Sequence, residues 1–126
     1  MIIKNYQELI VWNKAMDLVA EVYALTRLLP REELFALSTQ MRRAAVSVPS
    51  NIAEGQQRMA PREFVRFLTI ARGSNGELQT QLKICVRLSY LTSDQIQPVL
   101  SLSYEISKMI TSLIGKIENA DNQQKT

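Results

Sequence analysis

Apolar residues recur along the chain in alternating steps of three and four, which is the spacing of one helix face. The pattern predicts four helices over about residues 7–29, 31–58, 61–91 and 92–119. Pro30 ends the first, and Pro61 suits the first turn of the third. In the fourth, Thr92-Ser93-Asp94 forms a capping cluster. The apolar stripe expected for the first helix consists of Leu9, Trp12, Met16, Val19, Tyr23 and Thr26, widened by Leu18, Val22 and Leu25.

Long helices joined by short connections favour an all-α, up-down-up-down antiparallel four-helix bundle in a single domain. We assign residues 1–120 to this bundle and residues 121–126 to a mobile tail, because the tail has no apolar anchor. Pro49 lies inside the second helix and removes a backbone hydrogen bond. We therefore expect a kink near Pro49, or a break into two helices at Val48.

The composition argues against catalysis. The chain has no histidine and one cysteine, Cys85, so it lacks the commonest general base and has no internal disulfide or thiolate zinc cage. Cys85 lies on an apolar stripe and is expected to be a buried, inert thiol. Glu54 and Glu77 could form a carboxylate pair, but both lie beside arginines, and ion pairing is the simpler interpretation. We expect no enzyme activity, cofactor or metal.

No apolar run is long enough to span a membrane, and residues 1–8 lack the apolar core of a signal peptide. We therefore expect a cytoplasmic protein without a membrane partner. The net charge is +3, yet residues 27–87 carry +5 and the two ends together −2. Nine of the ten cations in this central region are arginines, which bind phosphates and carboxylates well. An anionic partner should therefore bind the middle of the chain.

Two sets of charged and polar residues are candidates for a function. Arg58, Arg62 and Arg66 recur every four residues, so in a helix they would share one face, and Arg42 is expected near the same end of the bundle. Lys83 and Arg87 would extend this surface. It could bind RNA or DNA through phosphate contacts independent of base sequence. The alternatives are a solvated helix face, or a scaffold that docks an acidic partner protein or a polymerase.

A second polar line accompanies the apolar stripe of the second helix. Its members on the second and third helices are Gln40, Arg43, Ser47, Asn51, Glu54, Arg72 and Glu77. We interpret it as a polar network at a subunit boundary, and the alternative is a solvated flank. On the third helix, Gly73 and Gly76 form a thin patch with Ala71 and Ser74, and we interpret it as a packing site that would let another helix approach closely. Trp12 and Tyr23 lie on an apolar stripe and are expected in the core rather than in a ligand pocket.

Several blocks of sequence are similar to a known family of four-helix-bundle proteins. The blocks cover residues 6–18, 40–55, 63–68 and 70–74, and they include Arg42-Arg43-Ala44 and Asn51-Ile52-Ala53-Glu54-Gly55. They resemble proteins encoded in intervening sequences of large-subunit ribosomal RNA genes, with a likeness extending over about residues 6–115. Asn75-Gly76 departs from the family pattern, which usually has a bulky residue there.

The resemblance implies a four-helix bundle that commonly assembles as a ring-like homopentamer. The family includes the accessory protein of diversity-generating retroelements, a basic pentamer that partners a reverse transcriptase and nucleic acid. Most members have no established activity. The resemblance therefore adds a homo-oligomer to the expectations for this chain and leaves its function open.

Overall fold

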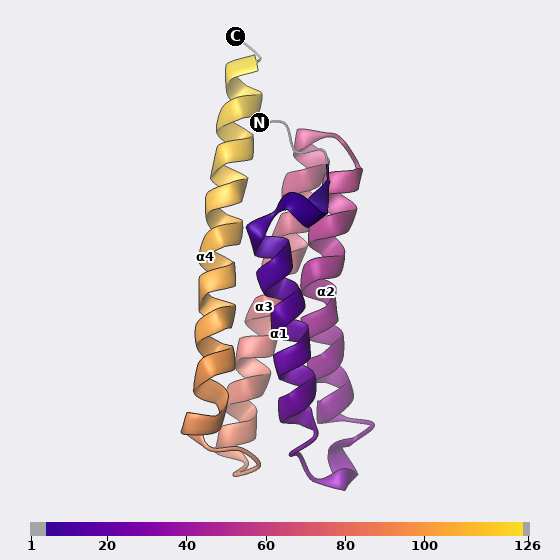
Figure 1. Ribbon diagram of the computed structural model, residues 1–126, viewed down its shortest axis with the longest axis vertical. Coiled ribbons are helices and arrows are strands. Elements are labelled where there is room, and N and C mark those ends of the chain that lie inside the picture. Colours follow the sequence, from indigo (N-terminus) through magenta and orange to yellow (C-terminus); the bar gives the residue numbers. More distant parts are fainter. Residues whose placement is uncertain (1–4, 125–126) are drawn as a thin grey trace.

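The structure is a computed structural model that describes residues 5–124. Its elements are the short 3-10 helices η1 (Tyr6–Glu8) and η2 (Arg31–Glu33) and the long helices α1 (Ile10–Thr26), α2 (Leu37–Gln57), α3 (Pro61–Arg87) and α4 (Ser93–Gln124) (Figure 1). No strand occurs within these residues. The prediction of an all-α fold with four long helices is confirmed.

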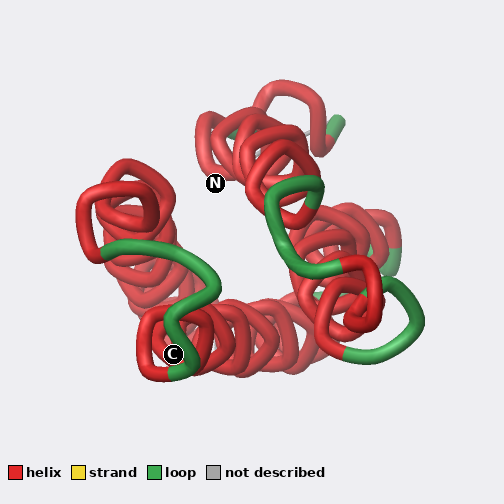
Figure 2. The backbone as a smooth tube through the Cα atoms, turned by 90° about the horizontal axis from the view of Figure 1, so that it is seen from below, coloured by secondary structure: helices red, strands yellow, loops and turns green. Residues whose placement is uncertain are grey.

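Consecutive long helices run in opposite directions. In Figure 1, α1 and α3 descend, whereas α2 and α4 ascend. Each helix packs against the next one in the chain, and α4 also packs against α1. The end view in Figure 2 shows the four helices arranged around a shared interior. This order places the beginning of α2 at the same end of the bundle as the end of α3.

The core is built from apolar side chains of all four helices. The α1 face that enters it is rotated from the predicted one. Ala15, Leu18 and Val22 are fully buried, whereas Met16 is 45% exposed and Trp12 packs half-buried at the margin. The buried face and the predicted apolar stripe lie side by side on α1. Because Ala15 is small and only weakly hydrophobic, the sequence pattern indicated the stripe of Trp12 and Met16 as the centre of the buried face. The expectation of a core position is thus met only in part for Trp12.

The connection between α1 and α2 differs from the prediction, because α2 begins at Leu37 rather than near residue 31. Residues 31–33 form η2, and the backbone of Ala36 (φ −123°, ψ −101°) departs from helical geometry. The Glu33 carboxylate then accepts a hydrogen bond from the Leu37 amide at 3.2 Å. A carboxylate at a helix N-terminus is favourable, so Glu33 fixes where α2 starts.

Helix α2 is continuous, so the break at Val48 does not occur. Pro49 lies buried inside it, and a kink at this residue stays a prediction. Near the end of the helix, Gly55 lies against α3. A Cβ atom at Gly55 would be 2.7 Å from Cβ of Phe67 and 3.2 Å from the Phe64 ring. The absence of a side chain at Gly55 therefore lets α2 and α3 approach closely.

Helix α3 ends at Arg87 rather than near residue 91. Ser89 has a φ of 61°, and the Tyr90 amide donates to the Cys85 carbonyl at 2.9 Å, a geometry typical of a Schellman cap. The predicted cap of the fourth helix is confirmed. Thr92 Oγ1 accepts from the Gln95 amide at 3.1 Å, and the Gln95 side chain accepts from the Thr92 amide at 2.8 Å.

Helix α4 continues to Gln124 instead of ending near residue 119. The first four residues of the expected tail, 121–124, are therefore helical, and residues 125–126 lie outside the described range. Cys85 is fully buried, as predicted, with its sulfur 3.6 Å from the sulfur of Met41. Burial, together with the nearby charge of Glu33, raises the pKa of the Cys85 thiol to about 11.

A buried polar cluster joins α3 to α4. Asn75 is completely buried, and its side-chain nitrogen donates to the Ser103 carbonyl and to Ser107 Oγ, both at 2.7 Å. The Ser103 hydroxyl donates back to Asn75 Oδ1 at 2.6 Å, and Gln79 Nε2 donates to Ser103 Oγ at 2.9 Å. A satisfied network of this kind fixes one register between two helices. The departure from the family pattern at Asn75 is therefore part of the packing.

Candidate nucleic-acid interface

The structure divides the six predicted nucleic-acid-binding cations among separate places. Arg58 follows the last residue of α2, whereas Arg62 and Arg66 lie in α3, so the three do not follow one helix. Arg58 and Arg66 nevertheless converge, because their guanidiniums lie 5.1 and 4.5 Å from the centre of the Phe67 ring. The prediction of one continuous helical face through these three residues is wrong at Arg58.

Arg58 and Arg66 are both paired with carboxylates. Arg58 Nη2 lies 2.8 Å from Glu54 Oε1, and Arg66 Nε lies 2.8 Å from Glu63 Oε2. The hydrogen bond from Arg66 lowers the pKa of Glu63 and raises the pKa of Arg66 itself. Their positive charge is thus locally compensated, which reduces their attraction for a polyanion.

Arg62, Lys83 and Arg87 form no ion pair with any described residue. Lys83 lies over the Tyr104 ring of α4, 5.7 Å from its centre. Arg62 lines a hollow of about 230 Å³ that Glu118 of α4 also lines. Arg62 and Arg87 are separated along α3 by about 38 Å, and helical periodicity places them within about 20° of the same face.

Small or short side chains occupy the middle of this face. We define the outer face of α3 by its aligned exposed residues, Arg62, Thr69, Gly73, Thr80 and Arg87. Apart from the adjoining residues and the backbone of α3 itself, no described atom lies within 4 Å of a Cβ position built at Gly73 or Gly76. Among the described residues, no helix therefore packs on these two glycines, whereas Ala71 of the predicted patch is buried and Ser74 contacts Ser47 of α2. The outer face of α3 therefore has small side chains in its middle and a cation near each end.

Arg42 lies at the opposite end of the bundle from Arg58, which corrects the prediction that they share one end. The two residues are about 24 Å apart along α2 because the helix rises about 1.5 Å per residue. Antiparallel packing places the beginning of α2 beside the end of α3, where Arg87 lies. The guanidinium of Arg42 lies over the Tyr23 ring at 4.6 Å, and its Nε donates to Thr26 Oγ1 at 2.9 Å. Tyr23 is half-buried and supports this arginine.

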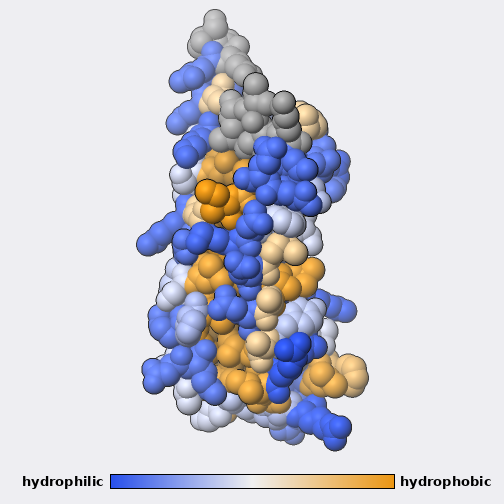
Figure 3. Space-filling model, viewed as in Figure 1, coloured by the Kyte–Doolittle hydropathy of each residue, from blue (hydrophilic) through white to orange (hydrophobic). Residues whose placement is uncertain are grey.

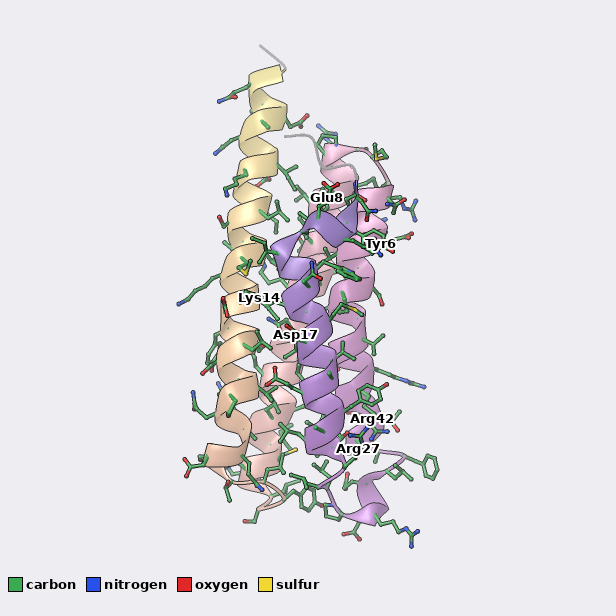
Figure 4. All side chains as sticks on the ribbon, in the orientation of Figure 1. Tyr6, Glu8, Lys14, Asp17, Arg27 and Arg42 are labelled. Carbon is green, nitrogen blue, oxygen red and sulfur yellow. The ribbon has the colours of Figure 1, made fainter. Side chains whose placement is uncertain are left out.

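One hollow is lined by Arg42 together with Arg27, Arg31 and Ser38, three residues that were not predicted to belong to a site. In Figure 4, Arg27 and Arg42 lie near each other at the lower end of α1 and α2. A usable signal was present in the sequence. Arg27 and Arg31 flank Pro30, where the chain turns, and such a turn brings the start of the next helix alongside.

The predicted subunit-boundary network is only partly assembled within the chain. Ser47 Oγ lies 2.8 Å from Ser74 Oγ of α3, and Asn51 donates to the Ser47 hydroxyl at 2.8 Å. Glu54 pairs with Arg58 rather than with Arg43 or Arg72.

The remaining members form no hydrogen bond with this cluster among the described residues, although Arg43 lines one hollow with Ser47. Arg72 donates to Thr111 Oγ1 of α4 at 3.1 Å, and Glu77 accepts from Gln81 at 3.2 Å. Gln40 and Arg43 have no side-chain partner among the described residues. The location of this network at a subunit boundary stays a prediction.

Apolar side chains also reach the surface. Phe35 is 91% exposed, Met59 76% and Ile10 67%. Figure 3 shows hydrophobic surface along the junction of α1 and α4. A groove of about 370 Å³ lies at this junction, with Leu9 and Leu113 among its lining residues. Such surface is typical of contacts with another molecule.

Within residues 5–124, no three side chains of the metal-ligating types gather in one place. In the same range, no helix is long and apolar enough to cross a membrane. The fold and its surface therefore define an all-helical bundle with arginines on its surface.

Comparison with known proteins places this bundle in a family. The model of the 23S rRNA-intervening sequence protein family matches residues 7–112. The chain belongs to this family, as the resemblance implied. A solved structure from Bacteroides thetaiotaomicron, described as a protein of unknown function from the S23 ribosomal protein family, is 28% identical with a TM-score of 0.77. The alignment covers 83% of this chain and 98% of that one. The search of curated proteins found no match.

Proposed function

We propose that this protein is a non-catalytic, self-associating bundle that binds nucleic acid along the outer face of α3. The supporting observation is that Arg62 and Arg87 on this face, and Lys83 beside it, have no carboxylate partner among the described residues. Phosphate contacts require positive charge at reachable spacing and release counterions when they form. A strand lying along α3 would meet these cations near both ends of the helix.

The smooth middle of the face supports the same proposal. Between the cations, Thr69, Gly73 and Thr80 leave no large side chain that would hold a strand away from the helix. The face offers no row of amide or arginine forks of the kind that reads base edges. We therefore propose contacts with the phosphates, independent of base sequence.

Fluorescence anisotropy with labelled RNA and DNA of equal length tests this proposal at several salt concentrations. We expect the affinity to fall steeply as the salt concentration rises. The variants Lys83→Gln and Arg87→Gln should each reduce, by about 1, the slope of the logarithm of the binding constant against the logarithm of the salt concentration. Lys116→Gln is the matched control, since Lys116 lines the groove between α1 and α4 instead. The proposal fails if nothing binds at low salt, if binding ignores salt, or if the control weakens binding equally.

The exposed apolar residues support the self-association in this proposal. Phe35, Met59 and Ile10 would lose contact with water in an oligomer, which favours assembly. Light scattering behind a sizing column measures the mass directly. We expect a mass several times that of one chain, with the ring of five implied by the resemblance as the specific proposal. A monomer mass at every concentration would refute it.

A further inference from the structure

We propose that the hollow between the end of α1 and the start of α2 binds a phosphate group. Three arginines, Arg27, Arg31 and Arg42, line this hollow of about 340 Å³, together with the hydroxyl-bearing Thr26 and Ser38. The other lining residues are Leu29, Pro30 and Leu34, so no carboxylate belongs to the lining. The hollow lies apart from the outer face of α3, and this proposal does not depend on nucleic-acid binding there.

Arg42 is held in place before any ligand arrives. Its guanidinium stacks on Tyr23, and its Nε donates to Thr26 Oγ1. The Thr26 hydroxyl is oriented in turn, because it donates to the Tyr23 carbonyl at 2.9 Å. The two terminal nitrogens of Arg42 have no partner among the described residues. A preorganised guanidinium loses little conformational freedom when it binds an anion.

Ser38 supplies an independent indication of a ligand. It is only 2% exposed, it lines the hollow, and its hydroxyl has no hydrogen-bond partner among the described residues. Gln81 Oε1 is the one fully buried side-chain nitrogen or oxygen without a partner among the described residues, so the Ser38 hydroxyl keeps a small accessible surface where Ser38 lines the hollow. A phosphate oxygen in the hollow would accept a hydrogen bond from this hydroxyl.

The nearby acidic residues do not fill the hollow. One Glu33 oxygen accepts from the Leu37 amide, and the other lies 3.5 Å from the Tyr90 hydroxyl. Glu32 is exposed and is absent from the lining. Three guanidiniums can share the several oxygens of a tetrahedral anion, whereas a carboxylate offers only two oxygens. The arrangement therefore favours phosphate over carboxylate.

Titration of the full-length protein with inorganic phosphate, followed by two-dimensional NMR, tests the proposal. We expect saturable shifts at Thr26, Ser38 and Arg42, with a much weaker response to acetate. Ser38→Ala should weaken phosphate binding about tenfold, which corresponds to one hydrogen bond to a charged group. Arg42→Lys keeps the positive charge but removes the planar guanidinium that stacks on Tyr23. It should weaken phosphate binding at least as much as Ser38→Ala.

Lys116→Gln is the control for net charge and should leave phosphate binding unchanged. The absence of saturable shifts, or equal weakening by Lys116→Gln, would overturn the proposal. Oligonucleotides with a 5′-phosphate or a 5′-hydroxyl identify the source of the group. Shifts with the phosphorylated form alone indicate a terminal phosphate, shifts with both indicate internal phosphates, and shifts with neither leave a free phosphate. If phosphate binds in this hollow but oligonucleotides do not bind along α3, the phosphate site is supported and the proposed nucleic-acid binding is refuted.

Discussion

Replacement of Gly55 by alanine introduces a methyl group where α2 meets α3. The new carbon would lie 2.7 Å from Cβ of Phe67, whereas carbon atoms in good contact are about 3.5–4.0 Å apart. It would also lie 3.3 Å from the backbone oxygen of Phe64. Phe67 Cβ and the Phe64 backbone oxygen belong to rigid parts of α3, so the two helices must separate locally by roughly 1 Å.

Overpacking of this kind costs about 1–3 kcal/mol, and alanine returns about 1 kcal/mol through its higher helix propensity. We therefore expect Gly55→Ala to lower the free energy of unfolding by up to about 2 kcal/mol. Gly73→Ala is the matched control, because nothing lies within 4 Å of its Cβ position. It should raise the free energy of unfolding by about 0.5–1 kcal/mol through propensity alone.

Urea unfolding followed by circular dichroism measures both variants, at one fixed protein concentration because self-association would shift the midpoint. A Gly55→Ala variant stabilised as much as Gly73→Ala would show that α2 and α3 do not approach as described. A destabilised Gly73→Ala variant would show that another molecule covers the outer face of α3. That result would restore the packing site predicted from the small residues.

Three further predictions concern single side chains. Asn75→Ala should lower the free energy of unfolding by about 2–4 kcal/mol in urea, because it removes buried hydrogen bonds and leaves a cavity. Ser89→Gly should raise it by about 0.5–1 kcal/mol in the same assay, since glycine adopts the positive φ of this cap without strain. Cys85 has a pKa of about 11 in the folded protein, so Ellman's reagent at pH 8 should label it only after unfolding. The folded pKa is raised, so the stability contributed by the neutral thiol is present at neutral pH. It should be lost as the pH rises from about 8.5 through this folded value.

The helices were predictable because apolar residues repeat with helical spacing over many turns. The ends of the helices were less predictable, because each end depends on one side-chain or backbone hydrogen bond. Glu33 stops α2 from starting at residue 31 by capping Leu37, and Ser89 ends α3 through its left-handed backbone. Thr92 and Gln95 were the exception, since a capping box has a readable spacing.

The buried cluster at Asn75 was missed for a different reason. Sequence periodicity ranks positions by hydrophobicity, so it did not predict that Asn75 is buried, and Asn75 was noted only as a departure from the family pattern. Ser103, which bonds to Asn75, recurs at helical spacing with the apolar Ile96, Leu100, Ile106 and Ile110 of the fourth helix. A serine at a core position is a signal that a polar partner faces it, because a buried hydroxyl requires a hydrogen bond.

Whether an arginine can bind an anionic partner depends more on the residues three and four positions away than on the helix face that it occupies. Glu54 stands four residues before Arg58 and Glu63 three residues before Arg66, so helical spacing alone brings each pair together. Arg87 has no acidic residue at either spacing before it, and it has no ion pair in the described structure. Charge counted over residues 27–87 therefore overstates the attraction at the α2–α3 hairpin and understates it at the end of α3. A polyanion should first meet the protein at Arg87 and Lys83, where positive charge remains uncompensated.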